Sequence, residues 1–368
     1  MSLVKIQGKE LIVSQAGPED SFASKQMQES YTEGGRISTR VTIKIEDANA
    51  ALDIAHPGNY RLLAFLPDVT MPVGTLAGWP HKVKAANSDE LYPAILVHRL
   101  AVHPDYRQQG IAKALWLELD RWIKSNFEAE KVIVYGYYQN GNQASRAWFK
   151  SCGGNFTNLQ ITNAPIKTVT PTLEIKAEQT YTVQELELSN RDQIAEVVNS
   201  LNEFYAGFSL FKPQSVDEFV DWLSLKNVGN STYKLNRYYV ATTPDKKVVA
   251  GIGIFDLNQL IDVRVVNPPA AVQLLNKLLK IFPKDGLLKT GQMNRVWYHP
   301  DYLEAGRFLW QEVRQRENKY SNNLLVSFDS SDNKLSRFFN FSKFQPTTRN
   351  NLVVLAAPKG FVISSPIV

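Results

Sequence analysis

The feature that most constrains this chain is an internal repeat. Residues 99–106 read Arg-Leu-Ala-Val-His-Pro-Asp-Tyr and residues 295–302 read Arg-Val-Trp-Tyr-His-Pro-Asp-Tyr, so the last four positions are identical. The segments 324–329 and 336–339 also repeat a strand and a helix that follow the first copy. Such self-similarity predicts two structural units of the same kind in tandem. At 368 residues the chain is long enough for two domains of ordinary size.

The first copy lies in a stretch that predicts a strand, a tight loop and a helix. Residues 96–102 suit a buried strand, which Pro104 ends because proline has no N–H to donate. From Ile111 onward, apolar residues recur near the 3.6-residue period of a helix. A loop that opens a helix presents unpartnered N–H groups and the positive end of the dipole, which suits phosphate. Gly110 allows close approach, Ala112 is small and Arg107 adds positive charge. This pattern alone leaves an ordinary strand-to-helix turn equally open.

The sequence of this stretch is similar to motif A of the GCN5-related N-acetyltransferases, the GNAT superfamily. Residues 107–112 read Arg-Gln-Gln-Gly-Ile-Ala after Val-His-Pro, and the family pattern is R/Q-x-x-G-x-G/A after a V-x-P strand. Residues 142–153 resemble motif B, N-x-x-A/S-x-x-x-Y-x-x-x-G, with Asn142, Ser145 and Gly153 in place. Phe149 stands where the family often has a tyrosine that protonates the departing sulfur.

The resemblance covers nearly the whole chain at the level of strand order. It implies an α/β (α+β) fold of two tandem GNAT-like domains, each a mixed, mostly antiparallel twisted sheet flanked by helices. We expect a first domain at residues 1–170 and a second at 178–368. Between them we expect one last strand at 172–177 and a linker.

Members of the family bind acetyl-CoA, so the resemblance implies acetyl-CoA as the cosubstrate. It assigns the pyrophosphate to the loop and the amides of the acyl arm to the backbone of the preceding strand. The implied residues are Leu100 and Val102 on the strand, Arg107, Gln108, Gln109, Gly110, Ile111 and Ala112 in the loop, and Asn142 and Phe149 on the far side of the arm.

Acetyl transfer to an amine benefits from a base. A lysine-like amine with a pKa of about 10.4 costs roughly 4–5 kcal/mol to deprotonate at pH 7. His98 stands where several family members have a carboxylate, and an imidazole titrates in a suitable range. Glu90, in the loop before the strand, is the second candidate for the catalytic base. The alternatives are a structural histidine and a solvated carboxylate. Tyr137 or Tyr138 could replace the missing acid, although tyrosines in a strand more often pack.

The second copy departs from the first in its loop. Trp116 follows Tyr106 by ten residues, whereas Trp310 follows Tyr302 by eight, so the second loop is two residues shorter. A shorter loop offers fewer inward N–H groups, and Glu304 adds negative charge beside the phosphate position. We expect the second domain to be degenerate and to hold CoA poorly.

Composition argues against several other classes of protein. The net charge is +5, but the lysines and arginines are scattered, which favours a solvated surface over a nucleic-acid or membrane surface. The single cysteine, Cys152, gives neither a disulfide framework nor a thiolate cluster, and no metal is expected. The N-terminus lacks a signal-peptide pattern and no window reaches the apolar length of a membrane span, so we expect a cytoplasmic protein.

The sequence therefore predicts an acetyl-CoA-dependent N-acetyltransferase that acetylates a primary amine directly in a ternary complex, with the chemistry in the N-terminal domain. A CoA-binding sensor or scaffold without turnover is the alternative that Phe149 suggests. The expected acceptor is a small-molecule or peptide amine of unassigned identity. Because family members often pair, a homodimer is a further expectation.

Overall fold

The computed structural model describes residues 2–6, 8–34, 38–54, 56–86, 88, 90–168, 181–227, 230–266, 268, 270–279, 282–330, 333–341 and 345–364. The linker and the strand expected at residues 172–177 lie outside the described residues. The position of the expected boundary between 170 and 178 therefore stays a prediction.

The first half of the chain ends with a long strand at residue 167. Its elements in chain order are β1 (Ser2–Ile6), β2 (Lys9–Gln15), the 3-10 turn η1 (Pro18–Asp20), α1 (Ser21–Glu29), β3 (Glu33–Gly34), β4 (Ser38–Ile43), α2 (Ala48–Asp53), β5 (Tyr60–Phe65), β6 (Gly74–Lys84), β7 (Leu91–Val102), η2 (Pro104–Tyr106), α3 (Ile111–Asn126), β8 (Ile133–Gln139), α4 (Gln143–Ser151) and β9 (Asn155–Lys167).

The second half follows the undescribed residues 169–180. Its elements are β10 (Thr182–Glu185), α5 (Arg191–Phe204), α6 (Val216–Ser224), β11 (Lys226–Asn227), β12 (Asn230–Lys234), β13 (Asn236–Thr242), β14 (Val248–Phe255), η4 (Leu257–Gln259), β15 (Ile261–Val266), α7 (Ala270–Leu279), β16 (Leu287–Leu288), β17 (Thr290–Tyr298), η5 (Pro300–Tyr302), α8 (Leu303–Glu317), β18 (Asn323–Asp329), α9 (Asn333–Phe339) and β19 (Thr348–Ala356).

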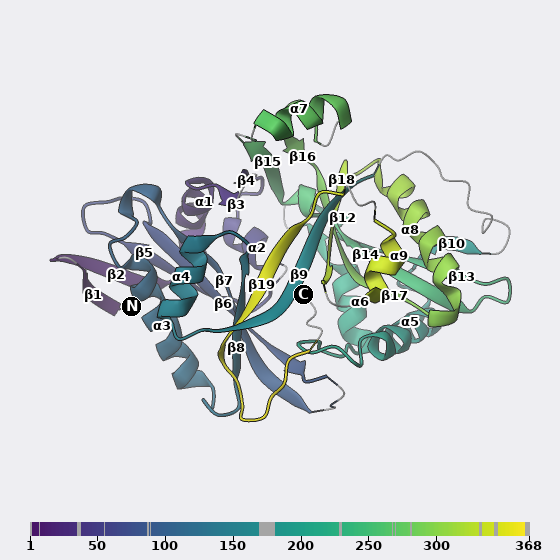
Figure 1. The fold of residues 1–368 in the computed structure, drawn as a ribbon, viewed down its shortest axis with the longest axis horizontal. Helices are drawn as coiled ribbons and strands as arrows, with labels where there is room; N and C mark the ends of the chain where they lie inside the picture. Colours follow the sequence, from purple (N-terminus) through teal and green to yellow (C-terminus); the bar gives the residue numbers. More distant parts are fainter. Residues whose placement is uncertain are drawn as a thin grey trace.

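One twisted sheet runs through both halves, which lie side by side in Figure 1. It has 13 strands in the order β1-β2-β5-β6-β7-β8-β19-β9-β18-β17-β14-β13-β10. Neighbouring strands in this sheet are antiparallel except for two parallel pairs, β7 with β8 and β17 with β18. These pairs occupy equivalent places in the two halves. The mixed, mostly antiparallel sheet flanked by helices, and its repetition in tandem, are thus confirmed.

The halves exchange their last strands at the centre of the sheet. β19 closes the second half in sequence, yet it pairs with β8 of the first half. In turn β9, from the first half, pairs with β18 of the second. β9 and β19 also pair with each other, as the teal and yellow strands in the middle of Figure 1 show. An edge strand needs a partner for its N–H and C=O groups, and the other half supplies it. The expected second unit, residues 178–368, thus contains a strand that belongs with the first half.

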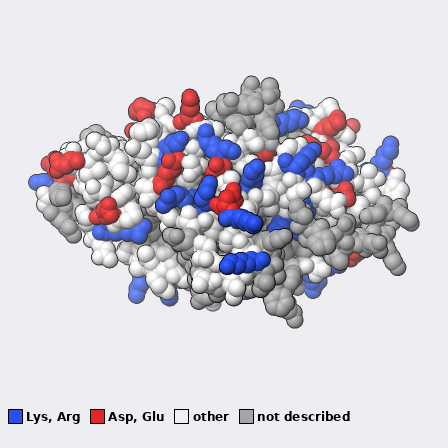
Figure 2. Space-filling view, turned by 90° about the horizontal axis from the view of Figure 1, so that it is seen from above, with Lys and Arg blue, Asp and Glu red and all other residues white. Residues whose placement is uncertain are grey.

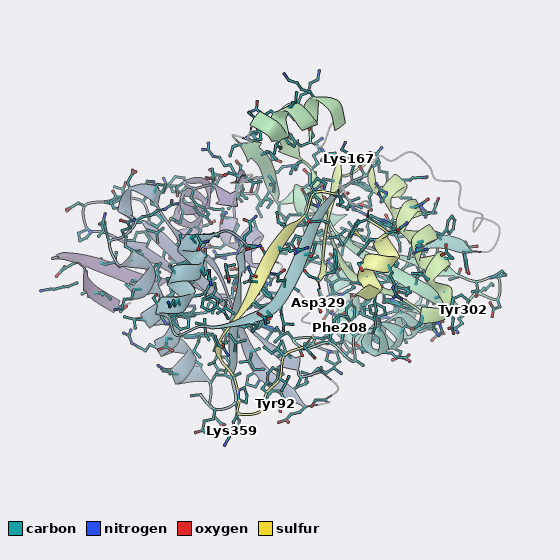
Figure 3. All side chains as sticks on the ribbon, in the orientation of Figure 1. Tyr92, Lys167, Phe208, Tyr302, Asp329 and Lys359 are labelled. Carbon is teal, nitrogen blue, oxygen red and sulfur yellow. The ribbon has the colours of Figure 1, made fainter. Side chains whose placement is uncertain are left out.

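Two further contacts join the halves. β4 pairs with β15 within a second sheet of order β16-β15-β4-β3. The C-terminal segment returns to the first half, where the Phe361 ring meets the Tyr92 ring edge-on at 5.1 Å. Figure 3 labels Tyr92 and Lys359 close together at this end of the molecule. The same segment is held to the second half, where the Ser364 N–H donates to Ser209 Oγ at 2.9 Å.

Helix α3 covers one face of the first-half sheet. Its buried residues follow the period expected from the sequence: Ile111, Ala114, Leu115, Leu119 and Ile123. Gly78 allows the close approach of this helix, because a Cβ there would lie 2.8 Å from Leu119 Cδ1. The other face of β7 and β8 is covered by Leu210 from the second half and by Phe361 and Ile363.

Surface charges are mixed in sign. On the described part of the face in Figure 2, lysines and arginines alternate with aspartates and glutamates. This agrees with the scattered basic residues of the sequence. Among the described helices, none has the combined length and apolarity that crossing a membrane requires.

The exchanged strand gives a prediction on stability. Leu352, in β19, is fully buried against β8 residues of the first half. Leu352→Ala should lower the free energy of unfolding by about 2–5 kcal/mol, since a buried leucine loses both contacts and transfer energy. Leu274→Ala is the matched control, because Leu274 is 62% exposed on α7. Urea unfolding followed by tryptophan fluorescence measures both, and equal effects would contradict the placement of β19.

Candidate active site

The candidate site is a gap between the ends of β7 and β8. The two strands pair in parallel from Ala94–Ile133 to Val97–Gly136. Beyond that pair, β7 continues to Val102 along β6, while β8 continues to Gln139 along β19. The strands therefore diverge, and their facing edges keep backbone groups available to a ligand. Leu100 and Val102, expected to meet the acyl arm, both lie on this diverging part of β7.

A bulge in β7 opens the gap. The register with β6 shifts between Thr75 and Ala77, so β7 carries one extra residue there. Arg99 lies at the bulge in a left-handed conformation, with φ of 55°. The equivalent residue of the repeat, Arg295, has φ of 50° and lies at a bulge in β17. The repeat seen in the sequence thus extends to the backbone conformation, since both arginines are left-handed and lie at a bulge.

The expected phosphate loop lies between η2 and α3. Gln108 and Gly110 are both left-handed, with φ of 61° and 85°. Gly110 is the N-cap of α3 and provides no side-chain cap, which leaves the first N–H groups of the helix to an incoming acceptor. The Arg107 Nε donates to the Val102 carbonyl at 3.2 Å, and the Gln109 amide donates to the Asp105 carbonyl at 3.4 Å. Ile111 and Ala112 begin the helix.

Helix α4 brings motif B beside this loop. The Asn142 side chain accepts the Ser145 N–H at 3.1 Å, so it caps α4. Trp148 Nε1 donates to the Ala112 carbonyl at 3.3 Å, which ties α4 to the start of α3. Phe149 is 4% exposed and reaches the point of divergence, because a Cβ on Gly136 would lie 2.7 Å from its Cζ. Phe149 thus lies beside Gly136, and its expected place along an acyl arm stays a prediction.

His98 stands at the point of divergence, next in chain to the last paired residue, Val97. Val97 packs in the core beneath α3, so His98 points to the opposite face. Its Nε2 lies 2.9 Å from Asn59 Oδ1. Burial and the nearby Arg99 guanidinium hold the pKa of His98 well below 6.5, so the ring is neutral at pH 7.

His98 belongs to a cluster of rings. His56 meets it edge-on at 4.8 Å and also contacts Trp79 at 4.5 Å. His81 stacks on Trp79 at 4.1 Å, and its Nε2 lies 3.0 Å from the Tyr135 hydroxyl. Burial lowers the pKa of His56 and that of His81 to about 4. Within the described residues, no three His, Cys, Asp or Glu side chains are arranged to hold a metal ion.

Glu90 lies elsewhere. It precedes the first residue of β7, eight positions before His98, which is roughly 26 Å along an extended strand. Its carboxylate is exposed and accepts the Tyr92 hydroxyl at 2.6 Å. The structure does not bring Glu90 together with His98 and the loop.

The second half has the same gap but a different lining. β17 and β18 pair only from Thr290–Asn323 to Gln292–Leu325, and a cavity of about 40 Å³ lies between their diverging ends. Phe208 and Asp329, both labelled in Figure 3, line it. The carbonyl of Val296, the counterpart of Leu100, accepts the Tyr205 hydroxyl at 2.6 Å. The Arg295 carbonyl accepts the Tyr238 hydroxyl at 3.1 Å. Side chains of this half therefore already bind the carbonyls at its bulge.

The second half also has no separate phosphate loop. Four residues, 107–110, separate η2 from α3, whereas α8 begins directly after η5. In the second half, two of the four corresponding positions are absent, as the sequence shows. The other two, Leu303 and Glu304, are the first residues of α8. Glu304, expected to add negative charge, is paired with Arg307 at 2.8 Å.

Sequence patterns missed several parts of the site. His56 and Asn59 come from the turn before β5, and His81 comes from β6. They meet His98 of β7 only because β5, β6 and β7 are neighbours in the sheet. The left-handed backbone of Arg99 was also not foreseen. An arginine at the same position in both copies was the single available signal.

Comparison with known proteins identifies the fold family. The sequence pattern of the Acetyltransferase (GNAT) family matches residues 27–154, which include α3, its loop and α4. Residues 27–154, about a third of the chain, thus match the GNAT family. This match supports an acyltransferase domain in the first half. No curated protein matches the chain in sequence.

Solved GNAT structures share this fold over nearly the whole chain. A GCN5-related N-acetyltransferase from Sphaerobacter thermophilus has a TM-score of 0.57 at 14% identity, over 97% of this chain and 98% of that one. N-myristoyltransferase from Saccharomyces cerevisiae with bound myristoyl-CoA has a TM-score of 0.60 at 11% identity, over 96% and 84%. A tandem GNAT protein from the clavulanic acid biosynthesis pathway has a TM-score of 0.56 at 12% identity, over 94% and 98%. At these identities the similarity shows the fold alone.

The left-handed loop gives a prediction on cosubstrate binding. Gly110→Ala should weaken the binding of acetyl-CoA at least tenfold, because alanine disfavours this conformation by about 1–2 kcal/mol and the loop would rearrange. Gly153→Ala is the matched control, since Gly153 ends α4 with φ of 81° and has open space around it. Calorimetric titration measures both variants. Equal affinities for the two would argue against a role for the loop.

The neutral histidines give a prediction on pH. His56 and His81 have folded pKa values of about 4, below the unfolded value of 6.5. Between these values the unfolded chain binds more protons, so the free energy of unfolding should fall as the pH falls from 6.5 to 4. Each histidine contributes on the order of 1–3 kcal/mol to this loss.

Urea titrations across this pH range test the effect. His81→Gln should flatten the slope, whereas His299→Gln, a half-exposed histidine in the second half, should leave it unchanged. An unaltered slope in His81→Gln would count against a neutral buried His81.

Proposed function

We propose that the first half transfers the acetyl group of acetyl-CoA directly to a primary amine within a ternary complex. One observation carries the proposal. The diverging edges of β7 and β8 and an uncapped helix start at Gly110 occur together in this half. The loop suits a pyrophosphate because left-handed residues turn N–H groups inward and the helix dipole adds positive charge.

The same residues that the sequence singled out take the roles in this proposal. Residues 107–112 hold the pyrophosphate, Leu100 and Val102 offer backbone groups to the acyl arm, and Phe149 lines the arm at the point of divergence. Asn142 acts through the helix that it caps. Arg107 would turn from the Val102 carbonyl to the phosphate, which frees that carbonyl for an amide of the arm.

His98 is the base in this mechanism. A neutral imidazole beside the point of divergence accepts a proton as the amine nitrogen attacks the thioester carbonyl. The new bond joins nitrogen to the acetyl carbon, and the carbon–sulfur bond then breaks. Phe149 has no proton to give, so the thiolate leaves as such and takes its proton from solvent. A thiol pKa near 8.5 makes this leaving group tolerable.

The contrast between the halves supports a single site. The second half lacks the separate loop, and tyrosine hydroxyls hold the carbonyls of Arg295 and Val296. An acyl arm there would have to displace the hydrogen bond on the Val296 carbonyl, the counterpart of Leu100. This half instead covers the opposite face of β7 and β8 through Leu210.

Calorimetric titration of the full chain with acetyl-CoA tests this proposal. We expect one site per chain, and none in Gly110→Asp, since a carboxylate would face the pyrophosphate. Release of free thiol with a panel of primary amines then tests turnover. Two sites would contradict the assignment to one half. One site without turnover on any amine would favour the CoA-binding alternative suggested by Phe149.

A further inference from the structure

A chain of hydrogen bonds extends from His98 into the first half. Asn59 lies in the turn between α2 and β5, where its N–H donates to the His56 carbonyl at 3.3 Å and His56 N–H donates to the Asp53 carbonyl at 2.8 Å. This turn presents the Asn59 side chain to His98, with Oδ1 2.9 Å from Nε2.

Asp53 fixes the orientation of the Asn59 amide. The Asn59 Nδ2 donates to Asp53 Oδ1 at 3.1 Å. Asp53 also pairs with the guanidinium of Arg61, which is 4% exposed. The same oxygen, Asp53 Oδ1, faces the Arg61 guanidinium, which can only donate, so this oxygen accepts. The amide nitrogen must therefore face Asp53, and the amide oxygen must face His98.

We infer that Asn59 is a positioning residue that sets the tautomer of His98. Because Asn59 Oδ1 accepts, the proton of the neutral ring lies on Nε2 and the lone pair on Nδ1. Nδ1 has no hydrogen-bond partner among the described residues. Nδ1 is thus the atom that takes the proton of the amine. This inference rests on the proposed role of His98 as the base.

An amide orients the ring without adding charge. The groups that act on His98 are Arg99 on β7, Arg61 on β5, His56 in the turn and His81 on β6, and each of them lowers its pKa. The carboxylate of Asp53 is one residue further away, beyond Asn59. A carboxylate in direct contact would raise the pKa of His98 and protonate it at higher pH. Asn59 therefore keeps the base neutral over a wider pH range.

Nitrogen-15 NMR of the histidine rings tests the inference in the full chain. His98→Gln assigns the signal by its disappearance. At pH 7 we expect the wild-type His98 to carry its proton on Nε2, and Asn59→Ala to show both tautomers. Asn49→Ala is the matched control, because Asn49 accepts from the same Arg61 but does not contact His98. A wild-type proton on Nδ1, or an unchanged tautomer in Asn59→Ala, would overturn the inference.

Kinetics supply a second readout. Asn59→Ala should lower kcat about tenfold or more with little change in KM, as part of the 10²–10⁴ that a general base contributes. Asn59→Asp should move the acid limb of the pH profile upward by about one unit, since an adjacent carboxylate stabilises the protonated ring. An unshifted acid limb in Asn59→Asp, together with a wild-type kcat in Asn59→Ala, would overturn the positioning role. The NMR result does not depend on turnover, so it separates a failure of this inference from a failure of acetyl transfer.

Discussion

The candidate active site depends on one change of partner, the point at which β8 leaves β7 and continues along β19. Up to Val97 and Gly136 the two strands satisfy each other's backbone groups. Beyond them, β19 holds one edge of β8 while the other edge faces the gap. A strand bonded on one side keeps its extended shape, and its free edge can bind an extended ligand. The first half therefore owes the shape of its gap to a strand supplied by the end of the chain.

The two halves show how one backbone plan supports different chemistry. Both have a parallel strand pair that stops early, a bulge and a left-handed arginine. In the second half, Tyr205 and Tyr238 bond the carbonyls at the bulge, and α8 starts where the first half has its loop. Buried carbonyls need partners, and these tyrosines meet that need from within the protein. In the second half these two carbonyls are therefore hydrogen-bonded within the protein itself.

Electrostatics around His98 favour a neutral imidazole. Burial and cationic neighbours oppose protonation, and the carboxylate of Asp53 is separated from the ring by the Asn59 amide and paired with Arg61. Such a base has less thermodynamic drive to take a proton, but it remains unprotonated at the pH where amines are mostly charged. Burial therefore both weakens His98 as a base and keeps its ring unprotonated.

The sequence by itself determined the local elements, the tandem plan and the loop. Periodicity placed α3, and the His-Pro-Asp-Tyr repeat located both turns, because each of these signals lies within a few consecutive residues. Only the tertiary structure decided the exchange of β9 and β19, the distant position of Glu90, and the meeting of His56, Asn59 and His98. These features depend on which strands become neighbours, and pairing between distant segments adds no periodic pattern to either one. Residue types therefore indicated candidate groups, and the order of the strands decided which of these groups meet.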